Sequence, residues 1–281
     1  MNAEWSIPFE LTSPYGTFPF NSPESVSGMT LVLDAQKCGV IAPIRVTTDN
    51  LSQQDGSLLH QEFVAGYQMK FGGWFMDQQD KPACDSDLRS VWDQLGLHLH
   101  ALLGNDVVLD GDNARMTWEP SGVDDRVLRN IRLLTEAQQS YDGGITGVEF
   151  SIHSLYPFAI SATTNNETLE ATVTNGGNAP AYPVITIFGP LTDAITITND
   201  TTGKSITYDP SLPGASDIAG GDYALIQMFE ENIYLNGDED NLRPGIDPIT
   251  SDFFTLPPGD SNLLLSDSSV DVEIDWQDTW Y

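Results

Sequence analysis

The spacing of apolar residues gives the first half of the chain one helical stretch, at residues 85–103. The apolar residues there that recur at intervals of four and three are Leu88, Trp92, Leu95, Leu99 and Leu102. Such intervals place side chains on one face of a helix. Asp85 or Ser86 can cap the start and Gly104 follows the end. We therefore predict a helix over 85–103 whose apolar stripe packs on a β layer, with Gly96 marking a close approach of another element.

The rest of the first half predicts strands. Residues 30–36, 40–48 and 58–76 are rich in β-branched and aromatic residues and are interrupted by glycine, and Asp55–Gly56 predicts a hairpin turn between two strands. A second Asp-Gly pair, Asp110–Gly111, predicts another hairpin, followed by further strands up to Pro157. The opening segment to about residue 30 is rich in proline and aromatic residues, so we expect an extended arm there.

The second half predicts short strands and no helix. The expected strands are residues 169–175, 182–189, 194–200, 204–209, 222–229, 231–237, 262–266 and 270–276. Apolar and polar residues alternate in several of them, as in a sheet with one buried face, and the number and spacing of the strands predict an antiparallel sandwich. The polar stretch 161–169 is the expected boundary. The predicted domains are 1–160, a β domain with one long helix, and 161–281, a β-sandwich.

Turn residues separate these strands. Asn175, Gly176 and Gly177 predict a turn that needs positive φ, and Gly189 with Pro190 predicts the end of a strand. The loop with Gly203 and the Pro-Pro-Gly turn at 257–259 predict two further reversals. These are folding signals and carry no reactive group.

The charge balance excludes some partners. The chain has 41 acidic and 11 basic residues and a net charge of −30, which repels nucleic acids and anionic membranes. A plain acidic surface and an adaptation to high salt both remain open. No apolar run of about 18 residues exists to span a membrane, and the N-terminus lacks a secretory pattern, so we expect cytosolic assembly. Cys38 and Cys84 are expected to be reduced and packed.

Candidate chemistry is scarce. Asn236, Asp238 and Asp240 stand at alternate positions, but the glycine falls too early for a calcium loop and the final glutamate is absent. His98 and His100 lie about 200° apart on the predicted helix and cannot share a metal. His60 and His153 are expected to be packed or surface residues. No motif for nucleophilic, phosphate or dinucleotide chemistry occurs. We therefore predict no catalytic, cofactor-binding or metal-binding residue, and not an enzyme.

An ordered set of phrases resembles a known family. They are ATVTNGGNAPAYPVITIFGP, ITITNDTTGKSITY, AGGDYALIQM, NIYLNG and FFTLPPGDSNLLL, at residues 171–265. This order resembles the C-terminal domain of siphovirus distal tail proteins, and residues 50–160 resemble the N-terminal domain more loosely. The resemblance implies a structural virion protein of the tail tip, assembled in the host cytoplasm, with a ring-forming N-terminal domain and a galectin-like C-terminal sandwich.

The same resemblance implies the partners. It implies a homo-hexameric ring that joins the tail-tube protein to the baseplate hub or a tail-associated protein, with tape measure and receptor-binding proteins as further candidates. Nucleic acid is not expected as a partner, and no cofactor is implied.

Two other functions stay open. A carbohydrate-binding or receptor-binding sandwich of the virion is favoured by aromatic residues near the C-terminus, Trp276, Trp280 and Tyr281, which could stack on sugar rings. Trp276 also continues a strand pattern and so fits a core. A glycan hydrolase would need two carboxyl groups in a cleft with perturbed pKa values. A mass measurement in solution separates a closed ring from a sugar-binding module.

Overall fold

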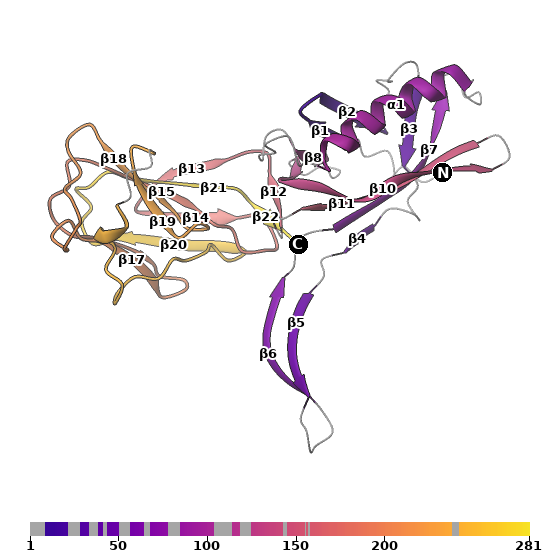
Figure 1. Cartoon of the computed structure of the whole chain (residues 1–281). Helices are drawn as coiled ribbons and strands as arrows, with labels where there is room; N and C mark the ends of the chain where they lie inside the picture. Colours follow the sequence, from indigo (N-terminus) through magenta and orange to yellow (C-terminus); the bar gives the residue numbers. More distant parts are fainter. Residues whose placement is uncertain are drawn as a thin grey trace. The chain divides into compact units, whose positions relative to one another are not determined.

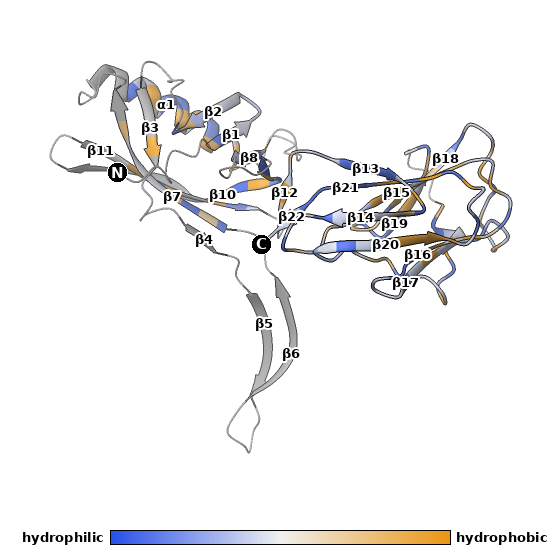
Figure 2. Cartoon of the chain, turned by 180° about the vertical axis from the view of Figure 1, so that it is seen from behind, coloured by the Kyte–Doolittle hydropathy of each residue, from blue (hydrophilic) through white to orange (hydrophobic). Residues whose placement is uncertain are grey.

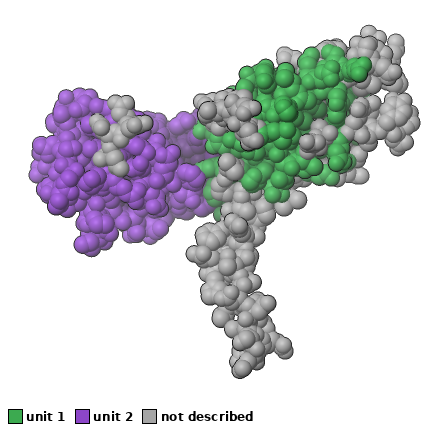
Figure 3. Space-filling view, viewed as in Figure 1, with its two compact units in different colours: residues 1–159, 281 green, residues 160–280 purple. Residues whose placement is uncertain are grey.

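The computed structural model divides the chain into two compact units, residues 1–159 with Tyr281 and residues 160–280 (Figure 3). It describes residues 9–21, 29–33, 39–41, 44–50, 57–64, 68–77, 85–103, 114–118, 125–142, 145–154, 156, 158–237 and 242–281. Tyr281 joins the first unit, where its ring meets that of Phe158 edge to face with centroids 5.3 Å apart. Each unit has its own hydrophobic core.

The described part of the first unit contains antiparallel sheets and one helix (Figure 1). One sheet has, in order, β2 (Gly16–Phe20), β1 (Phe9–Ser13), β8 (Arg115–Trp118) and β9 (Arg126–Leu128). The other has β10 (Ile131–Asp142), β11 (Ile145–Ser154), β7 (Gln68–Asp77) and β3 (Met29–Leu33), with β4 (Gly39–Ile41) also on β7. β5 (Ile44–Asn50) and β6 (Ser57–Val64) pair as a separate ribbon. The predicted turns at 55–56 and 110–111 lie outside the described residues.

The predicted helix is present as α1, Asp85–Ala101. Its end is two residues earlier than predicted, because Leu102 N and Leu103 N bond back to Leu99 O and His100 O, three residues away, which tightens the last turn. Leu95, Leu99 and Leu102 of the predicted stripe are buried, as is Val91. The helix contacts β1, β2, β3 and β10, so its apolar face closes a core shared by both sheets.

The expectation of an extended arm is wrong for residues 9–20. They form the β1–β2 hairpin, and Leu11, Phe18 and Phe20 are at most 1% exposed in the core of the first unit. The reason is a period of two in the apolar residues, which buries one face of each strand. Proline does not prevent this, since Pro19 lies in β2 at the edge of its sheet, where a missing N–H removes no ladder bond.

The second unit is a sandwich of two antiparallel sheets. One has the order β13 (Asn165–Thr168), β21 (Val272–Trp276), β15 (Val184–Phe188), β18 (Tyr223–Gln227) and β19 (Asn232–Leu235). The other has β14 (Ala171–Asn175), β20 (Gly259–Leu265), β16 (Ile195–Asn199) and β17 (Lys204–Tyr208). All eight predicted strands of this half are present, and one core cluster draws on both sheets. Among its described residues the one helical segment is a 3₁₀ turn, Arg243–Gly245.

The polar stretch 161–169 is only partly a loop. Residues 162–164 are exposed, but β13 pairs with β21 along its whole length as an edge strand. β13 consists of hydrophilic residues, as Figure 2 shows, and most of them face solvent. The stretch is joined to the C-terminal part of the same unit, since Ser161 N donates to Asp278 O at 2.8 Å. Polarity alone did not distinguish an edge strand from a linker.

The glycine pair after β14 has a different role from the one predicted. Gly203 and Gly259 do adopt positive φ, but Gly176 and Gly177 do not. A Cβ on Gly177 would lie 1.9 Å from the backbone oxygen of Thr279, so this glycine is needed for close approach of two segments. Asn175 fixes the turn, because its Oδ1 accepts from Gly177 N and its Nδ2 donates to Ala179 O and Leu256 O.

Candidate functional site

The two histidines of α1 lie in different environments. His98 is 8% exposed, with Nδ1 2.8 Å from Ser13 Oγ, whereas His100 is exposed. The two therefore do not share a site, in agreement with the sequence prediction. His153 is half-buried in β11, and its position in the ladder is opposite Arg132 of β10. The side chain of His60 lies outside the described residues, as do Cys38 and Cys84.

The rejected calcium loop is only partly described. Asn236 has φ 54° and folds its side chain back, donating to Asp222 Oδ1 at 2.9 Å and accepting from Tyr223 N. Asp238 and Asp240 lie outside the described residues. Within the described part of the chain, no three His, Cys, Asp or Glu side chains stand close enough to hold a metal ion. No helix there has the length and hydropathy to cross a membrane.

Two carboxyl groups of the described part have lowered pKa values. The Thr250 hydroxyl lowers the pKa of Asp247, and the backbone N–H of Ser269 lowers the pKa of Asp267. Asp267 is exposed and Asp247 is partly exposed, and hydrogen bonds to the ionised form of a carboxyl group favour that form. A glycosidase acid needs the opposite shift, toward a raised pKa. Neither residue therefore has the property required of that role.

The aromatic residues that favoured sugar binding are mostly buried. Trp276 is 6% exposed and Trp280 is 7% exposed, and Trp276 Nε1 donates to Thr174 O at 3.1 Å. Only Tyr281 of the three is exposed, at 49%. Buried indoles cannot stack on a sugar ring, so Trp276 and Trp280 do not support the sugar-binding alternative, and Trp276 is a core residue, as its strand pattern allowed. Their place in the alternation of the C-terminal strands was the better signal.

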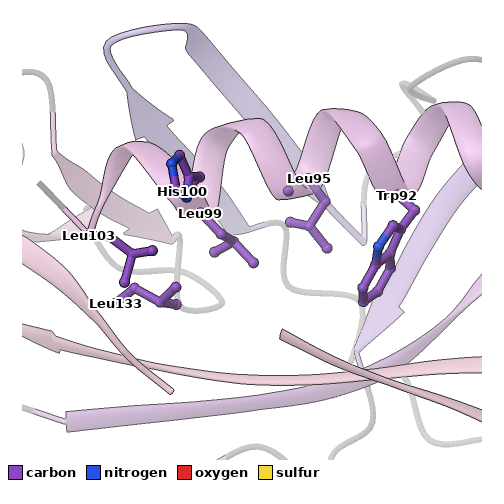
Figure 4. A pocket seen from close by; sticks show the side chains of 7 residues that line it. Trp92, Leu95, Leu99, His100, Leu103 and Leu133 are labelled. Atoms are coloured by element: carbon purple, nitrogen blue, oxygen red, sulfur yellow. The ribbon is translucent and has the colours of Figure 1, made fainter. Parts of the chain in front are cut away.

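An apolar pocket opens along α1 in the first unit (Figure 4). Its volume is about 180 Å³, and its lining residues are Trp92, Leu95, Gly96, Leu99, His100, Leu103 and Leu133. Figure 4 shows Leu103, just past the end of the helix, beside Leu133 of β10. A Cβ on Gly96 would meet nothing within 4 Å, so the predicted close approach at this glycine is wrong.

The second unit has two clefts of different chemistry. One is a polar cleft of about 360 Å³ lined by Asn165, Asn166, Glu167, Thr172, Thr174, Gly176, Trp276 and Asp278. Its polar groups largely bond to one another or to adjacent strands, as in the 2.8 Å bond from Asn166 Nδ2 to Asp275. The other, of about 530 Å³, is lined by Leu212, Pro213, Arg243, Pro244, Ile246, Pro248, Ser251 and Phe253. The Ser251 hydroxyl of the second cleft accepts from Thr207 N and donates to Thr207 O.

Two comparisons relate this chain to tail proteins of phages. Residues 176–280 match the family model described as the siphovirus-type tail component, C-terminal domain. No curated protein sequence matches the chain. The fold is similar to the crystal structure of the Dit protein of phage SPP1, described as a paradigm of the hub adsorption apparatus in phages that infect Gram-positive bacteria.

That likeness to SPP1 Dit has a TM-score of 0.62 at 16% identity and covers 90% of this chain and 99% of that chain. At this identity it establishes a shared fold. A chain of the phage P2 baseplate in its activated conformation with calcium aligns over 96% of this chain and 97% of its own length. Its TM-score of 0.40 at 10% identity falls short of a shared fold.

Proposed function

We propose that this chain is a Dit-like structural protein of a siphovirus-type tail and that it forms a closed homo-hexameric ring that joins the tail tube to the baseplate hub. One observation carries the proposal: the likeness to SPP1 Dit extends over 99% of that protein and includes both units. The family match adds independent support from sequence, over residues 176–280 of the second unit. In this proposal the chain acts by association and not by catalysis.

The two units have different roles in the proposed ring. The first unit closes the ring, and its core of two sheets and α1 gives it a rigid body for subunit contacts. The second unit, a sandwich of a five-stranded and a four-stranded antiparallel sheet, takes the part of the galectin-like domain and faces outward. A galectin-like sandwich does not imply sugar binding, because fold and function separate readily.

The proposed partners follow from this position in the virion. The ring meets the tail-tube protein on one side and the baseplate hub or a tail-associated protein on the other, with tape measure and receptor-binding proteins as further contacts. The site of action is the tail tip, after assembly in the host cytoplasm. Host attachment is then a property of the assembled tail.

The test is the mass of the purified full chain in solution. Sedimentation equilibrium and native mass spectrometry should give one closed species of six subunits, because a cyclic interface stops growing when the ring closes. A monomer or an open series of oligomers would contradict the ring. A monomer that binds immobilised glycans would instead favour the carbohydrate-binding alternative.

A further inference from the structure

Basic residues are very unevenly distributed along this acidic chain. Residues 160–280 contain two cations, Lys204 and Arg243, and the other nine of the 11 lie in residues 1–159. Four of those nine are arginines within 18 consecutive residues, Arg115, Arg126, Arg129 and Arg132. The first unit therefore has one sequence region where positive charge concentrates.

The fold gathers three of these arginines in one place, here named the arginine corner (Arg115, Arg129 and Arg132). Arg115 opens β8, and the β8–β9 register, which pairs Met116 with Leu128, brings Arg129 opposite Arg115 as the ladder ends. Ile131 N donates to Ala114 O at 3.1 Å, so the start of β10, with Arg132, lies beside the start of β8. The corner is thus where β8 begins, β9 ends and β10 begins.

Strand alternation directs the corner away from the core. Met116, Leu128 and Ile131 are each 0% exposed, and each is the immediate neighbour of one of the three arginines. Successive side chains of a strand point to opposite faces, so Arg115 and Arg132 leave the face that these apolar residues fill. All three arginines are half-buried, which holds their positions more firmly than those of fully exposed side chains.

The corner lacks carboxylate partners within the described part of the chain. Among the described residues, the buried Nε atoms of Arg115 and Arg129 have no hydrogen-bond partner. Arg132 Nη1 donates to the backbone oxygen of Ile131 at 3.0 Å. No ion pair joins these three to any described carboxylate. A buried Nε–H without an acceptor costs free energy, and the chain has 41 acids that could have supplied one.

We propose that the arginine corner is the face through which one subunit docks carboxylates of a second copy of this chain. The inference rests on the proposed ring, and it names the contact that opposes the repulsion between subunits of net charge −30. The occupant follows from charge complementarity, because arginine binds carboxylates in a planar, two-bond geometry and a second copy presents carboxylates on its surface. Tail-tube and hub proteins remain outcomes of the test.

The test compares two double variants of the full chain that have the same net charge. Arg115→Gln with Arg129→Gln removes the corner, whereas Arg89→Gln with Lys204→Gln removes two exposed cations elsewhere. In sedimentation velocity at moderate salt, the corner variant should need at least about tenfold more protein for half-assembly. The control should stay within about twofold of the unmodified chain. Equal behaviour of the two double variants would overturn the proposal.

Two further measurements keep the result decisive. Arg115→Lys with Arg129→Lys keeps the charge and should recover part of the assembly, even if the glutamine variant folds poorly. If the glutamine variant melts at lower temperature yet assembles normally, the arginines pair inside the subunit and the proposal fails. A ring insensitive to these substitutions overturns this inference alone. If the unmodified chain forms a dimer and the corner variant is monomeric, only the proposed hexamer is wrong. If the unmodified chain is a monomer at all concentrations, both the hexamer and the proposed docking face are wrong.

Discussion

His98 Nδ1 lies 2.8 Å from Ser13 Oγ, a buried contact that ties α1 to β1. The hydroxyl oxygen also accepts from Tyr15 N at 3.1 Å, so its own proton is available to donate to Nδ1. The tautomer of neutral imidazole that carries its proton on Nε2 can accept this hydroxyl proton at Nδ1. The ring of His98 lies edge-on to Phe18 with centroids 5.7 Å apart, in apolar surroundings. Burial lowers the pKa of His98 and so favours the uncharged form of the ring.

The first prediction is a loss of stability in mild acid. Burial lowers the pKa of His98 from its ordinary value of 6.5, so the unfolded chain takes up this proton at a higher pH than the folded chain. The stabilisation is complete above pH 6.5 and declines as the pH falls from there toward the folded pKa. Urea unfolding between pH 7.5 and 5 should show a steeper decline for the unmodified chain than for His98→Gln. Parallel profiles would show that His98 does not titrate differently on folding.

The second prediction concerns the buried stripe of α1. Leu95→Asp or Leu99→Asp should lower the free energy of unfolding of the first unit by more than about 3 kcal/mol, because an unpaired charge would replace a buried aliphatic side chain. Leu97→Asp is the matched control, since Leu97 on the same helix is 47% exposed. It should change stability by about 0.5 kcal/mol or less. Thermal melts that rank Leu97→Asp with the other two would contradict the assigned face.

The alternation of apolar and polar residues was the sequence signal that predicted strands best. It placed the eight strands of the second half, where residues such as Ile195, Ile197 and Ile206 fill one face at a period of two. The same signal was present at Leu11, Phe18 and Phe20, but the prolines around them favoured an arm. An edge strand tolerates proline, and edge position is a property of the fold that local sequence does not contain.

Contacts between segments far apart in the sequence were the features that the sequence could predict least. Gly177 is required by the backbone of Thr279, 102 residues away, and only the folded chain shows that approach. The buried Nε atoms of Arg115 and Arg129, which have no hydrogen-bond partner among the described residues, likewise depend on which carboxylates the fold brings near. Sequence could count the charges but could not place them. The family resemblance rests on the order of turn residues and strands along residues 171–265, which the sequence does contain.

The third prediction contrasts two glycines. Gly96→Ala should stabilise the first unit by about 0.5–1 kcal/mol, because alanine favours a helix and the added Cβ enters open space. Gly177→Ala should destabilise the second unit by at least about 2 kcal/mol, since the Cβ would collide with the Thr279 backbone. Denaturant titration of both variants gives the comparison. A destabilised Gly96→Ala would mean that the helix face is closely covered.

The fourth prediction is that residues 160–281 fold alone, because the core of the second unit is complete within them. A shorter fragment that begins at Asn165 should also fold but melt lower, having lost the bonds of Ser161 to Asp278 and Gln277. Fluorescence of the buried Trp276 reports the transition. In the full chain, proteolysis should cut first within the exposed residues 162–164. An unfolded 160–281 fragment would show that this unit depends on the first.

The fifth prediction is that salt strengthens assembly of the unmodified chain. Six subunits of −30 bring a nominal −180 into one ring, and most of the 41 acids of each chain must remain unpaired because only 11 basic residues exist. Raising the salt from 0.01 M to 1 M shortens the screening length from about 30 Å to about 3 Å, which relieves repulsion between whole subunits.

The arginine corner acts oppositely and at short range, so the difference in assembly between the unmodified chain and its corner variant should shrink as salt rises. Sedimentation at both salt concentrations measures the two effects together. A ring that is tighter in low salt would mean that the arginine pairs outweigh the net charge, and the balance argued from 41 acids would be wrong.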